Sequence, residues 1–420
     1  MKSNSVLCRT QLELTGDVQG IGLRPRLALI ANKHQLVGFV ANVNDVVALE
    51  IQGNVYAIEC FFLDLIEFTS ACDIQISKIE IPVLDTSVFE IRPSKSDVIS
   101  TGDAARKPFR LVRFPGDHAV CAACVDELFA KENRRYGYGF IGCAQCGPRY
   151  SVMTAVPYDR TRTRFSEFPL CEFCNQEYND VHDRRYHAET ISCQNCGPRW
   201  QLSPPTDGLA TKEMSDIALA NVVAKRIIGG DVICVQSMSG FHLLVNATDK
   251  QAVQLLRNRK QRPRKPFALM MKDTAMVRRY CRLNHEEAEA LQSSKAPLVL
   301  LKQHSHLDIA HEVAPGNPYL AVMLPSTSMQ HLLFHSIDVP LVATSANRSG
   351  EPIEYEPASA KENLALVADG FLSHNLCVEN PQDDSIIHVV LGKQTVLRRG
   401  RGYGLVPEVA VDNDVFGYSQ

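Results

Sequence analysis

Three absences narrow the classes to which this chain of 420 residues can belong. It has no run of about 20 apolar residues, and its N-terminus lacks the apolar core of a secretion signal, so we expect a cytoplasmic protein without membrane contact. Positive charge is not in excess, because the net charge is -3, and this disfavours nucleic acid as a partner. The Gly-Lys-Ser/Thr ending of a Walker phosphate loop is also missing, which excludes that motif.

Cysteine, by contrast, is plentiful, and eight of the 14 cysteines fall into four CxxC pairs. The pattern CAAC, eighteen residues and CAQC recurs fifty positions later as CEFC, eighteen residues and CQNC. This spacing is typical of structural zinc, because two CxxC turns supply the four thiolates of a closed tetrahedral site. Disulfides and redox-active pairs are the alternatives, but the sequence lacks the thioredoxin-like setting of redox pairs. We predict two zinc ions, bound by Cys121, Cys124, Cys143 and Cys146 and by Cys171, Cys174, Cys193 and Cys196.

The pattern of apolar residues predicts an α+β protein of several domains. Residues 1–95 follow the order β-α-β-β-α-β, with a turn at Asn44-Asp45 and with residues 88–94 as the closing strand. That order is typical of a ferredoxin-like sandwich, also called a split βαβ fold. The polar segment 94–108 predicts a domain boundary near residue 100.

The rest of the chain divides at about residue 205. Residues 110–204 contain few long apolar runs, so bound metal has to supply folding energy in this double zinc-ribbon region. Residues 205–410 alternate helix and strand, which predicts an α/β domain with a ligand crevice at its strand ends. Residues 411–420 are expected to form a tail.

A glycine-rich turn between the first strand and the first helix is a candidate phosphate site. Backbone N–H groups around Gln19, Gly20 and Gly22 can converge on an anion, and Arg24 can bind two of its oxygens. Asn42, on the adjoining predicted strand, can orient a water molecule for attack on phosphorus. An ordinary strand–helix turn is the alternative interpretation.

The third domain contains a candidate nucleotide site. Cationic side chains in one short segment suit a triphosphate, short polar groups after a buried strand suit the nucleotide, Asp384 or its neighbour suits Mg²⁺, and two late arginines suit phosphates. The predicted nucleotide-binding residues are Arg257, Lys260, Arg262, Lys265, Thr344, Ser345, Asn347, Asp384, Arg399 and Arg401. A solvated helix face is the alternative for the basic segment.

Two levels of resemblance extend these predictions. GDVQGIGLRPR followed by GFVANVND resembles the acylphosphatase motif, which implies that Arg24 binds phosphate and that Asn42 orients the attacking water. RRYGYGFIGCAQCGPR, SGFHLLVNAT and LVATSANRSGEPI resemble the zinc region and the YrdC-like domain of the HypF family of hydrogenase maturation carbamoyltransferases. This second resemblance covers residues 6 to about 408.

The resemblance to that family implies a function. Carbamoyl phosphate is hydrolysed in the first domain, and the product reacts with ATP in the YrdC-like domain to give carbamoyl adenylate for cyanide-ligand synthesis in NiFe-hydrogenase maturation. The implied cofactors are two zinc ions and Mg-ATP, with carbamoyl phosphate as substrate. The implied partner is a maturation protein that accepts the carbamoyl group on a cysteine, directly or through another chain.

The chain also departs from the family pattern. Gln236 stands where the family has a lysine, and Leu376, Pro381 and His388 replace arginines. Family members continue with a further C-terminal domain, so we expect either a fragment or a short form that needs a second chain. Two alternatives stay open: a zinc-containing RNA-binding or tRNA threonylcarbamoyl-adenylate-forming protein, and a non-catalytic partner of a full-length homologue.

Overall fold

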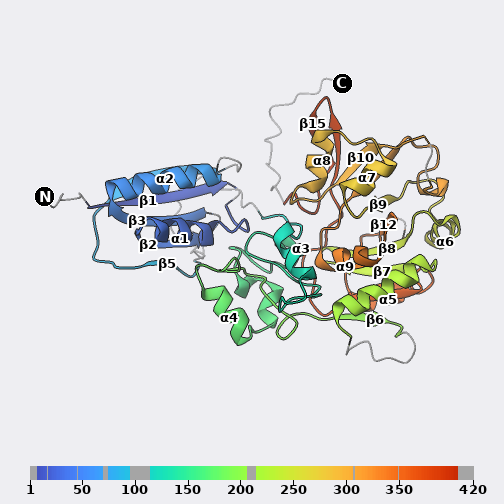
Figure 1. Cartoon of the computed structure of the whole chain (residues 1–420), viewed down its shortest axis with the longest axis horizontal. Coiled ribbons are helices and arrows are strands. Elements are labelled where there is room, and N and C mark those ends of the chain that lie inside the picture. The colour runs from blue at the N-terminus through green and yellow to red at the C-terminus, as the bar shows by residue number, and fades with distance from the viewer. Residues whose placement is uncertain are drawn as a thin grey trace, which may run out of the picture.

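The computed structural model has three parts that follow one another along the long axis of the molecule (Figure 1). The first domain (blue) lies at one end, the cysteine-rich residues 114–199 (green), here called the zinc segment, lie in the middle, and the third domain (yellow to red) lies at the other end. The structure describes residues 7–16, 18–44, 46–69, 74–94, 114–205, 214–305, 308–348 and 350–404. Asp45, the predicted boundary near residue 100 and the predicted tail lie outside these ranges.

The first domain is one sheet covered by two helices. Its elements are β1 (Leu7–Gly16), α1 (Leu23–Lys33), β2 (Val37–Val43), β3 (Val46–Asn54), α2 (Val55–Thr69), β4 (Ile74–Ile81) and β5 (Phe89–Ile91). The strand order is β4-β1-β3-β2-β5, and α1 and α2 contact each other. Leu14, Leu49 and Phe61 lie in its fully buried core. The predicted ferredoxin-like sandwich is confirmed.

The closing strand, however, was assigned wrongly from the sequence. Residues 74–81 close the sandwich, because β4 pairs antiparallel with β1, whereas β5 adds to the opposite edge in parallel with β2. The sequence signal of β4 is weak for two reasons. Its isoleucines break the alternating pattern between Ile76 and Ile79, and the strand is mostly exposed, so little apolar periodicity is required of it.

The zinc segment has little regular structure. It contains the short helices α3 (Ala122–Phe129) and α4 (Glu172–Asn179) and the 3₁₀ turns η1 (Tyr150–Val152), η2 (Arg160–Arg162) and η3 (Arg164–Glu167). Each α-helix starts directly after the first cysteine of a cluster, with Cys121 and Cys171 as the N-caps. Its two halves therefore repeat the same local structure, as the sequence repeat indicates.

The third domain is built on a sheet of ten strands in the order β15-β14-β10-β11-β9-β12-β8-β7-β13-β6. The strands are β6 (Trp200–Ser203), β7 (Ile233–Ser237), β8 (Gly240–Asn246), β9 (Ala268–Met270), β10 (Leu298–Lys302), β11 (Tyr319–Met323), β12 (Leu341–Ser345), β13 (Gly370–His374), β14 (Ile386–Val390) and β15 (Lys393–Arg398). The helices are α5 (Asp216–Ile228), α6 (Lys250–Lys260), α7 (Thr274–Tyr280), α8 (His285–Gln292), α9 (Ser328–Ser336) and α10 (Pro357–Asn363), with the 3₁₀ turn η5 (His311–Val313). Among the described helices of this domain, four starts are capped by side chains, at Asp249 before α6, Asp273 before α7, Asn284 before α8 and Thr327 before α9.

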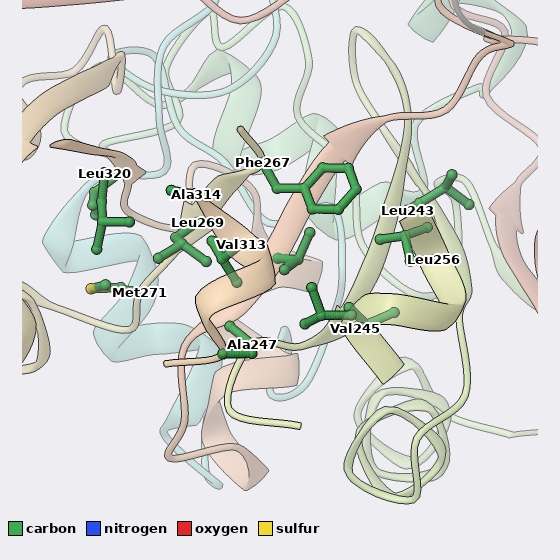
Figure 2. Close-up of a cluster of buried hydrophobic side chains, with 14 of the residues drawn as sticks. Leu243, Val245, Ala247, Leu256, Phe267, Leu269, Met271, Val313, Ala314 and Leu320 are labelled. Carbon is green, nitrogen blue, oxygen red and sulfur yellow. The ribbon is translucent and has the colours of Figure 1, made fainter. Parts of the chain in front are cut away.

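Two hydrophobic clusters hold this domain together, and one of them extends beyond it. Figure 2 shows the first, where Leu243 and Val245 of β8 pack with Leu256 of α6 and with Phe267. The second joins Leu128 of α3 to α5, α9 and the other face of the sheet. The first half of the zinc segment therefore shares a core with the third domain. No helix among the described residues is long and apolar enough to span a bilayer.

Candidate functional site

Both predicted zinc sites gather their four cysteines into tight clusters. The Sγ atoms of each group lie within 4.8 Å of one another, and adjacent Sγ atoms are 3.6 to 3.8 Å apart. A tetrahedron of thiolates with Zn–S bonds of about 2.3 Å has edges of about 3.8 Å. The donor set and its spacing thus fit Zn²⁺ with no open ligand position, which makes the metal structural.

In the zinc segment, an arginine from each half contacts the cysteine cluster of the other half. Arg134 lies in the first half, yet its Nη2 is 3.4 Å from Sγ of Cys174 and 3.3 Å from Sγ of Cys193 in the second cluster. Arg184 lies in the second half, and its Nη2 is 3.2 Å from Sγ of Cys121 in the first cluster. Four thiolates around one Zn²⁺ carry a net negative charge, so each guanidinium stabilises the cluster of the other half.

One glutamate on each short helix pairs with two arginines of the other half of the zinc segment. Glu127 of α3 binds Arg184 at 2.6 Å and also pairs with Arg185. Glu177 of α4 binds Arg134 at 2.8 Å and also pairs with Arg135. These four arginines are thus engaged inside the segment, which argues against their use as a phosphate-binding surface for RNA.

The predicted phosphate residues of the first domain line one small cavity of about 330 Å³. Its lining includes Gln19, Gly20, Gly22, Arg24 and Asn42 from the first domain, and Ala144, Arg149, Tyr158, His187 and Glu189 from the zinc segment. Gly20 and Gly22 have φ angles of 72° and 76°, a left-handed conformation that favours glycine. The glycine-rich turn is therefore positioned as predicted, but the zinc segment covers it.

Arg24 is almost completely buried against the zinc segment. Its Nη2 lies 2.8 Å from Oε1 of Glu189 and 2.8 Å from Oδ1 of Asp159, and it also donates to the carbonyl of Tyr158. Its Nη1 donates to Ser94 Oγ at 3.1 Å. Burial raises the pKa of Glu189 above the usual value for a carboxyl group.

Gln19 and Asn42 contact the same covering segment. The side-chain oxygen of Gln19 accepts from the backbone N–H of Tyr158 at 2.9 Å, and its Nε2 donates to the carbonyl of Asn44. Asn42 is 2% exposed, and its Nδ2 lies 3.4 Å from the carbonyl of Tyr158. The backbone carbonyl of Tyr158 therefore contacts both Arg24 and Asn42, the two residues to which the acylphosphatase resemblance gives catalytic roles.

A larger cavity, of about 670 Å³, lies between the zinc segment and the third domain. Asp117 and Pro148 line it from the zinc segment, and His242, Asp384 and Arg401 line it from the third domain. Asp117 Oδ2 and His242 Nδ1 are buried there without a hydrogen-bond partner. Because buried polar atoms are usually satisfied, these two atoms mark places where a bound molecule can donate or accept a hydrogen bond.

The two cavities are separated by a very short stretch of chain. Pro148 lines the larger cavity and the next residue, Arg149, lines the smaller one. Arg149 Nε donates to the carbonyl of Gly20 at 2.6 Å, and its backbone N–H donates to Oδ1 of Asp117 at 2.6 Å. One residue thus contacts both the phosphate loop and a carboxylate of the second cavity.

Asp384 is one of the predicted nucleotide-site residues that reach this larger cavity. It is 7% exposed, and its two oxygens bind His242 Nε2 at 2.9 Å and Arg401 Nε at 2.8 Å. Burial acts to raise the pKa of Asp384, but Arg401 and His242 outweigh it and hold the pKa well below its usual range. Both oxygens have cationic or ring partners, so Asp384 does not fit the role of an Mg²⁺ ligand that the sequence suggested.

The basic segment 257–265, which spans the last turn of α6 and the residues after it, forms a second group of predicted residues. Lys260 Nζ donates to the carbonyls of Ser345 and Asn347 at 2.6 and 2.8 Å, and Arg262 reaches Thr344 Oγ1 at 3.3 Å. Burial lowers the pKa of Lys260 to about 8 and that of Arg262 to about 10. These cations therefore stabilise the turn after β12.

The remaining predicted cations have different surroundings. Arg257 is 4% exposed, and its guanidinium donates to backbone carbonyls, including those of Arg262 and Val313. Arg399 donates to the carbonyls of Tyr403 and Gly404. Lys265 is exposed. Arg257 thus holds the backbone of the basic segment, whereas Lys265 and Arg399 are both exposed.

Strand pairing connects the basic segment and the turn after β12 with the residues that line the larger cavity. Ser345 of β12 lies directly opposite His242 of β8 in the antiparallel register, so both side chains lie on the same face of the sheet. His242, Asp117 and Glu189 were not among the residues predicted from the sequence. Only the motif around His242 could have indicated one of them. Glu189 gains its place through its contact with Arg24 of the first domain, and Asp117 through the cavity that the zinc segment shares with the third domain.

Comparison with known proteins agrees with this architecture. Family models match residues 10–91 (acylphosphatase), residues 120–153 and 170–203 (HypF finger) and residues 225–400 (telomere recombination, the Sua5/YciO/YrdC model). The carbamoyltransferase HypF of Synechocystis sp. is 41% identical over 398 residues, and that of Rhodobacter capsulatus is 36% identical over 395 residues. These matches cover 94% and 93% of this chain and 50% of each relative.

Solved structures give the same result. A full-length HypF in a phosphate- and nucleotide-bound form superposes with a TM-score of 0.87 at 37% identity, covering 96% of this chain and 51% of that one. HypF of T. kodakarensis gives a TM-score of 0.81 at 35% identity, with 94% and 49% covered.

The fold and the metal sites define a class of protein in which an acylphosphatase-type domain is joined through a double zinc finger to a Sua5/YrdC-type domain. Within that class the chain belongs to the HypF family. It spans about half the length of the curated relatives it matches.

Proposed function

We propose that this chain carries the carbamoyl-phosphate- and ATP-dependent steps of a carbamoyltransferase of NiFe-hydrogenase maturation. In the first step, a water molecule attacks the phosphorus of carbamoyl phosphate, the P–O bond to the carbamoyl group breaks, and phosphate and carbamate are formed. Arg24 and the N–H groups around Gly20 and Gly22 would bind the phosphate, and Asn42 would orient the water. The acylphosphatase match and the shared cavity of these residues support this assignment.

The observation that carries the proposal is the closeness of the two cavities. Arg149 lines the smaller cavity and its neighbour Pro148 lines the larger one. This short stretch of chain is therefore what separates the two cavities between which carbamate would move. Carbamate decomposes in water, and an enclosed passage between the sites would protect it. The core that the zinc segment shares with the third domain supports a fixed distance between them.

In the second step, a carbamate oxygen attacks the α-phosphorus of ATP, and pyrophosphate leaves as carbamoyl adenylate forms. The larger cavity offers Asp117 Oδ2 as an acceptor, which suits the amino group of carbamate. Lys260, Arg262 and Lys265 would face the phosphates of Mg-ATP. The relative crystallised with phosphate and nucleotide supports a nucleotide substrate.

Two departures from the family pattern have a local explanation. Gln236 is 2% exposed, donates to the carbonyl of Tyr355 and accepts from the N–H of His374, so it replaces a cation by a neutral connection between strands. Leu376 is buried in the core that joins the third domain to the zinc segment. We propose that both changes alter nucleotide affinity without removing the site.

A cytoplasmic location and transfer to a cysteine of a maturation protein belong to the same proposal.

The test is isotope exchange between ATP and pyrophosphate. Exchange is expected only when carbamoyl phosphate is present, and it should be lost in the Arg24→Ala variant. It should not be lost in Arg164→Ala, because this guanidinium pairs with Glu379 and lines neither cavity. Full exchange without carbamoyl phosphate, or unchanged exchange in Arg24→Ala, would reject the coupled route.

A further inference from the structure

The cavity around Arg24 does not have the charge of an open anion site. Nη2 of Arg24 binds two carboxylates, those of Glu189 and Asp159, at 2.8 Å each. Both carboxylates come from the zinc segment, and the side chain of Glu189 is only 3% exposed. One cation therefore faces two anions, and an approaching phosphate would meet a negative charge at the residue that should bind it.

Among the described residues that line this cavity, no other cation is available to an anion. The guanidinium of Arg149 donates to the backbone carbonyls of Gly20, Cys146 and Ala144. Burial lowers the pKa of His187 to about 4, so this ring is neutral near pH 7. A phosphate that pairs with Arg24 therefore has to displace a carboxylate from the guanidinium.

Glu189 is placed so that such an exchange does not leave it unpaired. Its Oε2 accepts from the hydroxyl of Tyr178 at 2.9 Å and from the backbone N–H of Arg160 at 3.0 Å. These bonds lie within the zinc segment and do not involve Arg24. When Arg24 moves away, the buried carboxylate keeps two donors, so the cost of an unsatisfied buried group is avoided.

We propose that Glu189 and Asp159 form a carboxylate latch that closes the Arg24 site, and that a phosphate group opens it by competing for the guanidinium. The latch acts from the zinc segment, so anion binding in the first domain is coupled to the contact between that domain and the zinc segment. The inference rests on the proposed function only for the identity of the natural ligand, because any phosphate-bearing ligand would have to compete in the same way.

The probe is inorganic phosphate, and the protein is the full chain loaded with zinc. In Glu189→Gln one of the two competing charges is removed, so phosphate should bind at least about tenfold more tightly than to the unchanged chain, which corresponds to about 1.4 kcal/mol. Calorimetry gives the dissociation constants. Glu167→Gln is the matched control, because Glu167 is a half-exposed carboxylate of the same segment that pairs with Arg164, and its affinity should not change.

Further variants protect the result against misfolding. Asp159→Asn should tighten phosphate binding in the same direction, and Arg24→Ala in the Glu189→Gln background should abolish it. Zinc content and the melting temperature confirm the fold of each variant. Phosphate binding to Glu189→Gln that is equal to or weaker than binding to the unchanged chain, or undetectable in both, overturns the latch.

The outcome is separable from that of the proposed function. If phosphate binds as expected while no carbamoyl phosphate is hydrolysed by any variant, the latch stands and the proposed reaction fails. If carbamoyl phosphate is hydrolysed with the same KM by the unchanged chain and by Glu189→Gln, the reaction stands and the latch fails.

Discussion

Asp384 is a buried carboxylate with two side-chain partners, Arg401 and His242. Replacing it by asparagine removes the charge that Arg401 needs, and the buried guanidinium is left uncompensated. We expect the Asp384→Asn variant to lose about 3 kcal/mol of unfolding free energy, measured by urea unfolding. Asp383→Asn is the control, since Asp383 is about half exposed and lies 3.6 Å from Arg398, so a loss as large as that of Asp384→Asn would contradict the prediction.

The same carboxylate predicts a pH dependence. Its pKa is depressed in the folded protein by Arg401 and His242, after burial has acted in the opposite direction. A group with a depressed pKa contributes stability above the pKa of the unfolded chain, about 3.9 for Asp, and this contribution is lost as the pH falls below that value. Melting temperatures of the unchanged chain and of Asp384→Asn should therefore converge below about pH 4. A constant gap down to the lowest measurable pH would contradict this assignment.

Individual residues also show which contacts of the candidate site can be predicted from the sequence. Arg24 and Asn42, which the sequence assigns to one phosphate site, line one cavity, because the turn and strand that hold them are local in sequence. The pairing of Arg24 with Glu189 joins residues 165 positions apart, and no periodicity encodes it. Charge alone was also a poor guide in the basic segment, where Arg257 donates to backbone carbonyls that the sequence does not reveal.

At the scale of elements, the exchanged arginines make each zinc site depend on the other half of the zinc segment. Removing Arg184 deprives the first cluster of a donor to Cys121 and Cys124. Loss of such a partner typically lowers metal affinity about 10- to 100-fold. Competition with a chromophoric chelator should therefore show that Arg184→Ala releases one of its two zinc ions more readily, whereas Arg164→Ala retains both. Equal resistance of the two variants would argue that the arginine–thiolate contacts carry no energy.

The elements differ in how far the sequence predicts them. The cysteine clusters were predicted in full, because ligand type and spacing alone nearly determine a closed zinc site. The strand Ile74–Ile81 was missed, because an exposed edge strand needs few apolar residues. The strand Trp200–Ser203 pairs directly with Gly370–His374 in the sheet of the third domain, although the sequence places it at the end of the zinc region.

At the scale of the whole molecule, the start of the zinc segment packs against the last described part of the third domain. A Cβ atom at Gly116 would lie 2.6 Å from the carbonyl oxygen of Gly402 and 2.7 Å from the backbone nitrogen of Gly404. Gly116→Ala should displace this stretch and its neighbour Arg401, at a cost of about 1 to 3 kcal/mol. Calorimetric melting should show the loss, whereas Gly142→Ala, where a Cβ meets nothing closer than 3.7 Å, should melt at nearly the original temperature.

This contact also bears on how such a protein can be divided or recombined. Residues 114 and 404 meet, the first zinc cluster shares its apolar interior with α5 and α9, and one strand of the large sheet precedes residue 205. A chimaera of two relatives joined at residue 205 would therefore combine mismatched halves of one interior. A junction ahead of Phe114 would exchange an intact domain, and only such a junction should give well-expressed hybrids.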